Sequence, residues 1–536
     1  MEDITGDITA FLQSCADAFI SAMDWLPDSW PDWLKSILLL ALIVTVGRGF
    51  MVVLELLYKS PLTLLHRAIL LLFSPFGKSR WAGWRHIRKH NQTRKGGLFL
   101  GQWRKWLVLR RDIHHHGEGH FITIAAPGGG KSTAAIIPSI LECKEGSLVI
   151  TDPKGELTAI TRRHRETKGR VVYLSPFYED FERHTGLEYP DSGFNPFDAI
   201  ENGSNLRALA DNFARLLCVT DRAESNSYFK DEGAELLSLF ITWIIRHELK
   251  ENHTLPYLYK LVRADPKKTF FYMSHVDDPL LNDDVDRFSK MISTAPAQWQ
   301  GAISKAQLAT KRYVPTSPLA VHTAKSGFDP KWLKSENVTV YILVPSEHVQ
   351  TAAPWLNLII GLIGESVGRA GKARPVTFLL DELPALGYLP DLRTQMRQYR
   401  SSGLRMWLFT QTTDALADRD MYGQEGFRDL MALCDTKQFF SIRSFQTAKE
   451  ISEMCGERER LNRTLNTKED ISAATVGVPL IRPEEITRLK KGHQIIIRPE
   501  IPPIRARLVP YFTRKKWRKI TDNNPYRGWC LESGGN

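Results

Sequence analysis

Cysteine is scarce in this sequence, and its few cysteines are not spaced for metal binding. Six cysteines are scattered over 536 residues, and no CxxC pair occurs. Neither a zinc site nor a disulfide framework is indicated, and a reducing compartment suits most of the chain. No helix-turn-helix, zinc finger or other sequence-reading module is visible. Any contact with nucleic acid is therefore expected to be non-specific and made through phosphates.

Positive charge is what the chain has in excess. The net charge is +11 and the pI is about 9.2. This balance suggests a polyanionic partner, either nucleic acid or anionic lipid. Much of the excess lies in residues 78–111, which contain eleven Lys or Arg and no Asp or Glu. Residues 1–35 have the opposite character, with seven acidic residues and one lysine.

One apolar run is long enough to cross a membrane. Residues 36–57 would form a helix of roughly 33 Å, interrupted by Arg48 and Glu55. A shorter apolar stretch at 61–76 could be a second span, an interfacial helix or a stem into the cytosol. The positive-inside rule places everything after residue 78 in the cytoplasm and mildly prefers a single span. We therefore expect a membrane anchor at 1–77, followed by a basic juxtamembrane linker at 78–120.

A glycine-rich segment has the context of a phosphate-binding loop. FITIAA (121–126) is expected to be a buried strand, PGGGKST follows it, and a helix begins next despite Pro138. Successive backbone N–H groups and the helix N-terminus would bind phosphate, Lys131 would reach the β- and γ-phosphates, and Ser132 would bind magnesium. Ala125 stands where the first glycine is expected, and a glycine-rich turn with a chance lysine is the alternative. The predicted ATP- and Mg²⁺-binding residues are Ala126, Pro127, Gly128, Gly129, Gly130, Lys131, Ser132 and Thr133.

Two further segments supply polar groups at strand ends. VTFLLDE (376–382) is typical of a buried parallel strand that ends in two acids. Asp381 would hold magnesium and Glu382 would act as general base, the alternative being an acidic helix cap. The strand RMWLFTQ (405–411) ends in Gln411, which would sense the γ-phosphate unless it is a solvated loop residue.

The distance between Lys131 and Asp381 in the sequence predicts an insertion. The gap of 250 positions is too long for one sheet, and the stretch at about 225–325 is helical in pattern. We expect an α/β P-loop ATPase domain from 121–225 and 326–536, with an all-helical domain inserted at 226–325. Further strands are predicted at 147–151, 170–175, 338–344, 437–442 and 494–498.

Several motifs together resemble one family. AAPGGGKST is followed by DPKGE (152–156), FNPFD (194–198), LLDELPALGYLPDL (379–392) and SSGLRMWLFTQ (401–411). In these segments the chain resembles the type IV coupling proteins, the TraG/TraD-like ATPases of conjugation and type IV secretion. The resemblance continues through 434–459 and 482–512, and so covers most of the chain after residue 120.

The resemblance implies a RecA/FtsK-like motor that assembles as a homo-hexamer at the bacterial inner membrane. It implies that a relaxase–single-stranded DNA complex is received and passed to type IV secretion channel components, with inner-membrane lipids as further partners. In such a ring an arginine of one subunit would reach the nucleotide of the next, with Arg400 and Arg443 as candidates. The DPKGE segment is expected to follow a strand beside the phosphate-loop strand, which would bring Asp152 and Lys154 near the nucleotide unless the segment merely initiates a helix.

Three functions stay open from the sequence. The first is a coupling ATPase for DNA transfer, and the second is the same motor with protein effectors as cargo. The third is a nucleotide-gated receptor or adaptor that recruits substrate without translocating it. Lys131, Asp381 and Glu382 argue against the third, because an adaptor has no need of a general base. The basic end KKWRK (515–519) is most simply a solvated tail.

Overall fold

This computed structural model describes residues 79–90, 96–105, 109–144, 146–218, 227–465 and 471–526. The apolar segments expected in the membrane, 36–57 and 61–76, lie outside these ranges. Among the helices that are described, none is long and apolar enough to cross a membrane.

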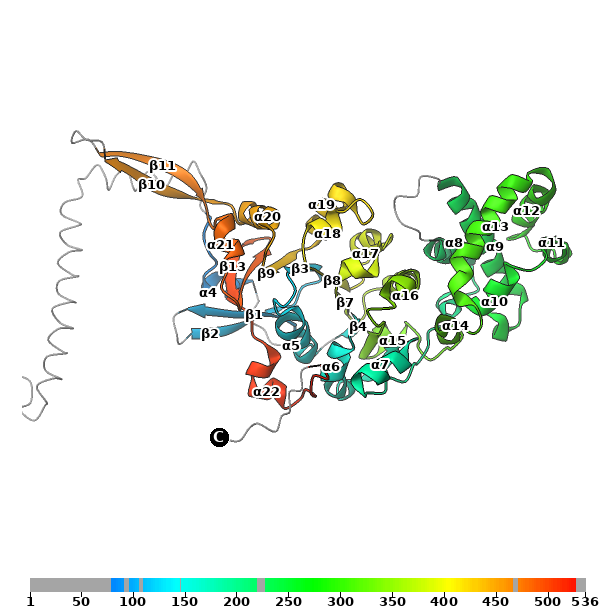
Figure 1. The fold of residues 1–536 in the computed structure, drawn as a ribbon, viewed down its shortest axis with the longest axis horizontal. Helices are drawn as coiled ribbons and strands as arrows, with labels where there is room; N and C mark the ends of the chain where they lie inside the picture. Colours follow the sequence, from blue (N-terminus) through cyan, green and yellow to red (C-terminus); the bar gives the residue numbers. More distant parts are fainter. Residues whose placement is uncertain are drawn as a thin grey trace, which may run out of the picture. The chain divides into compact units, whose positions relative to one another are not determined.

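A single large sheet organises the α/β part of the described chain (Figure 1). From β9 to β5 its strands run parallel, and β2, β1, β13 and β12 extend it as antiparallel neighbours. In spatial order the strands are β2 (Leu109–His115), β1 (Leu98–Lys105), β13 (Ile501–Arg507), β12 (His493–Arg498), β9 (Thr436–Phe440), β3 (Phe121–Ala125), β8 (Leu404–Thr410), β7 (Val376–Leu380), β4 (Ser147–Thr151), β6 (Val338–Ile342) and β5 (Arg170–Leu174).

The parallel strands are the ones that the sequence predicts best. β3, β4, β6, β7 and β8 are buried along their whole length, and their sequences are nearly continuous apolar runs. Such runs are typical of strands covered by helices on both faces. Alternate residues of these strands indeed contribute to two separate hydrophobic clusters, so that Ile122 belongs to one and Phe121 to the other.

Helices cover both faces of the sheet. One cluster of buried side chains joins the sheet to α5, α6, α7 and α22, and the other joins it to α16, α17, α19 and α20. The bounds on the first face are α5 (Ile137–Glu142), α6 (Glu156–Glu166), α7 (Tyr178–Thr185) and α22 (Lys515–Arg518). Those on the second are α16 (Val349–Arg369), α17 (Leu392–Gln398), α19 (Gly423–Leu433) and α20 (Phe445–Cys455).

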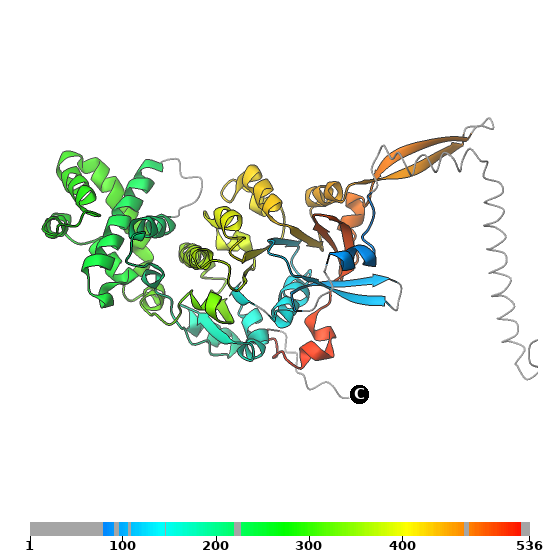
Figure 2. The same ribbon diagram turned by 180° about the vertical axis from the view of Figure 1, so that it is seen from behind.

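The helices expected between the nucleotide motifs are present (Figure 2). The long helix α9 packs against α8 and α13, and α8 also packs against α16. The helical run begins with α8, before the boundary expected at residue 226. Its members are α8 (Leu206–Leu217), α9 (Ser227–His247), α10 (Leu255–Leu261), α11 (Pro266–Ser274), α12 (Asn282–Thr294), α13 (Pro296–Thr310) and α14 (Pro318–Thr323).

Two segments depart from the sequence expectation. Residues 78–120, expected as a linker, contribute α4 (Trp84–Lys89), β1 and β2, and the two strands belong to the main sheet. The basic tail at 515–519 is not simply solvated, because Trp517 is only 1% exposed and packs under the sheet. In both segments buried residues stand close to charged ones, so composition alone gave no sign of their place in the core.

A two-stranded hairpin stands apart from the main sheet. It consists of β10 (Glu457–Leu465) and β11 (Ile471–Pro479), which pair with each other as a separate sheet (Figure 1). Its base adjoins the start of the described chain, since the Ser79 backbone N–H donates to the Glu457 carbonyl over 3.1 Å.

Candidate functional site

The glycine-rich loop after β3 has the backbone conformation of a phosphate cradle. Gly128 and Gly130 take positive φ angles of 72° and 97°, which side-chain-bearing residues rarely adopt. Gly129 is needed for space, because an added Cβ would lie 2.9 Å from both the Ala126 carbonyl oxygen and the Ser441 Cβ. The Gly129 N–H donates to the Ala126 carbonyl over 3.0 Å and closes the turn.

The helix after this loop starts with an unusually wide turn. Residues Lys131–Ile136 form a π-type segment, and the Ile137 N–H donates to the carbonyl of Ser132, five residues back. Pro138 follows in the first turn of α5, where its missing N–H is tolerated. The wide turn thus lets a helix continue through a proline that would break a regular one.

Lys131 meets the acidic motif directly. Its Nζ lies 2.7 Å from Glu382 Oε2, although 251 residues separate the two in sequence. Glu382 itself has φ 54° and ψ 59°, a left-handed conformation that is rare and costly for a glutamate. The end of β7 therefore holds a strained residue whose carboxylate is turned toward the phosphate loop.

Asp381 lies beside this pair, and one of its carboxylate oxygens accepts no hydrogen bond in the described structure. Burial raises its pKa to about 6, and Lys131 opposes that rise while Glu382 and Asp152 add to it. Within the described residues, its buried Oδ1 has no hydrogen-bond partner. Its backbone N–H donates to Thr151 Oγ1 over 2.8 Å, which fixes the strand end. A carboxylate oxygen without a donor, in the field of the Lys131 ammonium, fits a magnesium–nucleotide complex.

Asp152 lies at this edge of the sheet but not where it was expected. The prediction that β4 adjoins the phosphate-loop strand is wrong, because β8 and β7 lie between β3 and β4. Asp152 instead neighbours the acidic strand end, and its Oδ2 accepts from both the N–H and the hydroxyl of Thr158 over 2.8 Å. It therefore anchors the start of α6, while Lys154 is exposed.

The remaining predicted residues fall at different ends of the sheet. Gln411 follows β8, the strand between β3 and β7, so it emerges between the phosphate loop and the acidic pair. Arg443 follows β9 at the same edge and is exposed. Arg400 precedes β8 at the opposite edge, where it pairs with Asp435 over 2.6 Å. Within one subunit the fold thus keeps Arg400 away from the phosphate loop.

Sequence reasoning missed two residues that shape the site. Ser441 has φ 52°, and its carbonyl accepts from the Ala126 N–H over 3.4 Å, beside Gly129. Thr151 positions Asp381 from the neighbouring strand. Neither carries a motif, and only the strand order brings them to the loop.

One other group of side chains could hold a cation by geometry. Asp180, Glu347 and His348 have ligand atoms within 4.8 Å of one another in the described chain. His348 Nε2 already bonds Asp180 Oδ2 over 2.9 Å, and Arg183 contacts the same carboxylate. These contacts explain the arrangement without an ion.

Comparison with known proteins gives a consistent result. Residues 78–526 match the family model described as "Type IV secretory system Conjugative DNA transfer". The chain is 23% identical over 460 residues to the protein VirD4 of Rhizobium rhizogenes, which covers 84% of this chain and 66% of that protein. It is 25% identical over 416 residues to a probable conjugal transfer protein TraG of Sinorhizobium fredii, covering 74% and 63%. The matches thus span just under two thirds of these relatives' length.

Solved structures share the fold. A structure of the bacterial conjugative coupling protein TrwBdeltaN70 has a TM-score of 0.58 at 17% identity, and covers 81% of this chain and 95% of that chain. TrwB in complex with ADP and Mg²⁺ has a TM-score of 0.56 at 15% identity, with the same coverage. The mixed α/β architecture expected from the sequence is therefore confirmed.

Proposed function

The chain belongs to the type IV secretory system conjugative DNA transfer family, and from that premise we propose that it is an ATPase that couples recognition of a relaxase–DNA complex to transport through a type IV secretion channel. The proposal includes an N-terminal membrane anchor at 1–77, a cytoplasmic ATPase region at the bacterial inner membrane, and assembly as a homo-hexamer.

The observation that carries the proposal is the contact between Lys131 and Glu382. A phosphate loop and an acidic strand end meet at 2.7 Å across the fold, at the sheet edge where α/β proteins bind ligands. A receptor that only bound nucleotide would not need a carboxylate strained into this position. The related TrwB has been solved with ADP and Mg²⁺, which supports ATP and magnesium as the ligands of this site.

The side chains suggest how hydrolysis is switched on. An incoming γ-phosphate would compete with Glu382 for the Lys131 ammonium, because both are anionic partners. Once released, the Glu382 carboxylate can accept a proton from the attacking water as general base. Gln411, emerging between the two, would hydrogen-bond the γ-phosphate or that water.

Magnesium binding is assigned to Asp381 and Ser132. A bound Mg²⁺ would neutralise charge on the phosphate oxygens. Asp381 would orient this site through its unpaired Oδ1, while residues 126–133 offer their N–H groups to the phosphates.

Two substitutions test the ATPase proposal in the full chain. Glu382→Gln is expected to lower ATP turnover by about 10²- to 10⁴-fold while nucleotide still binds. Lys131→Ala is expected to lower both turnover and nucleotide affinity. Glu347→Gln, an exposed acid after β6, serves as the control and should leave turnover unchanged. Turnover and conjugative transfer are measured on the same variants, and normal transfer with abolished turnover would refute a motor.

Protein effectors are the alternative cargo, since the motor would be the same. Crosslinking of the full chain to single-stranded DNA during active transfer separates the two. Recovery of DNA supports the relaxase–DNA cargo, and recovery of protein alone supports effectors. If the protein is only an adaptor, Glu382→Gln should leave the rate of conjugative transfer unchanged.

A further inference from the structure

A cavity far from the phosphate loop gathers basic and aromatic side chains. It measures about 430 Å³, within the range of small-ligand sites, and lies where the start of the described chain crosses the antiparallel half of the sheet. Its lining includes Trp81, Trp103, Arg104, His493, Arg505 and Arg507, and no acidic residue. We call it the basic cavity.

The sheet register concentrates these charges on neighbouring strands. Arg104 in β1 lies directly opposite Arg110 in β2, and Arg507 in β13 lies opposite His493 in β12. Arg104 and Arg110 are like charges in directly opposed positions, an arrangement that destabilises a sheet. A cluster of this kind is therefore costly to the fold and calls for an anionic partner.

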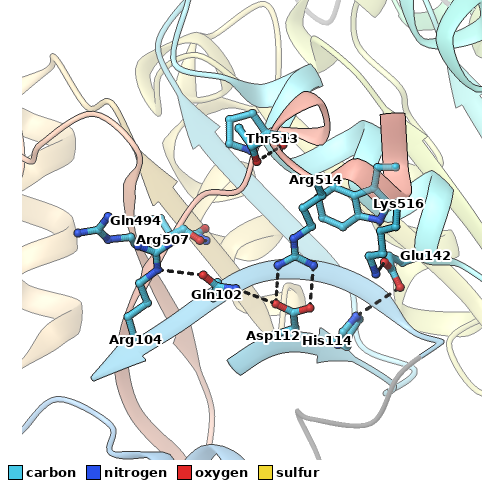
Figure 3. A network of polar contacts seen from close by, with 12 residues as sticks. Gln102, Arg104, Asp112, His114, Glu142, Gln494, Arg507, Thr513, Arg514 and Lys516 are labelled. Atoms are coloured by element: carbon cyan, nitrogen blue, oxygen red, sulfur yellow. Dashed lines mark hydrogen bonds and ion pairs between the residues drawn. The ribbon is translucent and has the colours of Figure 1, made fainter. Parts of the chain in front are cut away.

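The nearby carboxylate does not neutralise the cluster. Asp112 accepts two hydrogen bonds from Arg514, at 2.6 and 2.7 Å (Figure 3). Arg104 donates instead to the neutral Gln102 side chain over 2.9 Å. Neither Arg104, Arg505 nor Arg507 has a salt bridge to a carboxylate in the part of the chain that the structure describes.

The titration of two lining groups agrees with this geometry. Burial lowers the pKa of Arg104, and Arg110, Arg507 and Arg514 lower it further. Burial also lowers the pKa of His493, with Arg507 and Arg505 acting in the same direction. In both cases burial is the larger cause, and the neighbouring arginines add to it.

The aromatic walls and the chain's path indicate which anion is bound. Trp81 and Trp103 line the basic cavity, and the ring centroid of Trp103 lies 5.7 Å from that of Trp84. Amphipathic tryptophans are typical of membrane interfaces. Trp81 follows the apolar stretch 61–76 by five residues, which span at most about 17 Å of extended chain. If that stretch contacts the bilayer, the basic cavity lies at headgroup depth or just beneath it.

We propose that the basic cavity binds the headgroup of an anionic phospholipid through Arg104, Arg505 and Arg507, and so fixes the orientation of the ATPase region against the membrane. The inference rests on the proposed membrane anchor but not on ATP hydrolysis. The fold creates this site, because β1 and β13 lie about 400 residues apart in sequence and contribute adjacent arginines.

The test uses the full chain in lipid nanodiscs of phosphatidylcholine, with or without phosphatidylglycerol. Hydrogen exchange is followed on peptides that cover 98–105 and 493–507. Phosphatidylglycerol is expected to slow their exchange severalfold. In the triple variant Arg104→Gln/Arg505→Gln/Arg507→Gln this protection should disappear, since each basic residue near an anionic surface contributes roughly fivefold to binding.

A matched variant controls for net charge. Lys267→Gln/Lys268→Gln/Lys311→Gln removes the same charge from exposed positions of the helical segment and should keep the protection. The proposal would be overturned by equal exchange rates in the two disc types or by equal loss of protection in both triple variants. It would also be overturned if the chain did not remain in the discs. A second result would also overturn it. If single-stranded DNA slows the exchange of these peptides while phosphatidylglycerol does not, and the arginine variant abolishes that effect, the cavity is a nucleic-acid site. ATP turnover of the same discs reports separately on the proposed function.

Discussion

Thr151 is a small residue on which the acidic motif depends. Its hydroxyl oxygen accepts the Asp381 backbone N–H over 2.8 Å at the end of β4. Thr151→Val should leave that N–H unpaired and loosen Asp381, at a cost of about 1–3 kcal/mol in unfolding free energy. We expect ATP turnover to fall severalfold.

The neighbouring strand supplies a matched control. Thr377 in β7 is fully buried, and its hydroxyl has no hydrogen-bond partner in the described structure. Thr377→Val removes the same group three positions away along the paired strands and should be neutral or slightly stabilising. Denaturant unfolding and steady-state turnover compare the two variants, and equal effects would show that Thr151 has no positioning role.

Asp152 predicts a pH dependence of stability. Burial raises its pKa to about 6, above its unfolded value of 3.8. Its contribution to folding is thus most favourable below about pH 4 and is lost as the pH rises through about 6. Asp152→Asn can still accept hydrogen bonds from Thr158 but does not titrate. The unfolding free energy of the variant relative to the parent should therefore rise by about 1 kcal/mol between about pH 5 and pH 7.5. Urea midpoints at the two pH values measure this gain, and a pH-independent difference would contradict it.

The residues of the candidate site differ in how far sequence could predict them. Lys131, Asp381 and Glu382 each stand at the end of a buried apolar strand or in a glycine-rich turn, so local pattern was enough to predict them as candidates. Ser441 and Thr151 have no such pattern, because their roles depend on which strands are neighbours. Strand order is a property of long-range packing, and for the same reason Asp152 was placed beside the wrong strand.

At the scale of elements, burial on both faces decided what was predictable. The parallel strands are continuous apolar runs and were expected at nearly their observed bounds. β1, β2 and β13 were missed, since LFLGQWRK and LRRDIHH mix charges with apolar residues and IPPIRAR contains two prolines. Antiparallel strands that lack a continuous apolar run are recognised only once their partners are known.

The short helix α22 ties the C-terminal segment to the phosphate-loop helix. Trp517 is buried, and its indole N–H donates to Glu142 at the end of α5 over 2.7 Å. Arg514 and Lys516 add ion pairs on either side (Figure 3). The segment thus packs under the helix that carries Lys131 at its other end.

Trp517 should therefore matter to stability more than its place in a basic tail suggests. Trp517→Ala is expected to cost about 3–5 kcal/mol through the cavity it leaves, and Trp517→Phe about 1–2 kcal/mol through the lost hydrogen bond. Lys515→Ala, exposed on the same helix, should stay within about 0.5 kcal/mol. Urea unfolding of the three variants tests this order. An unchanged unfolding free energy in Trp517→Ala would mean that the C-terminal segment does not contribute to stability.

At the scale of the whole molecule, the sheet separates the two candidate arginines. Arg443 follows β9 at the sheet edge that carries its own phosphate loop, whereas Arg400 lies at the opposite edge and pairs with Asp435. If Arg400 stabilises a γ-phosphate, that phosphate belongs to a neighbouring subunit. Arg443 can act within its own subunit.

Mixed assemblies distinguish these roles in the proposed ring. Arg400→Ala and Lys131→Ala should each abolish ATP turnover alone, but mixing them should restore part of it. At some interfaces an intact Arg400 from the Lys131→Ala subunit then meets the intact phosphate loop of the Arg400→Ala subunit. Arg443→Ala mixed with Lys131→Ala should show no such rescue, because neither subunit carries a complete site of its own. An inactive Arg400 mixture that still assembles would exclude Arg400 as the residue acting between subunits.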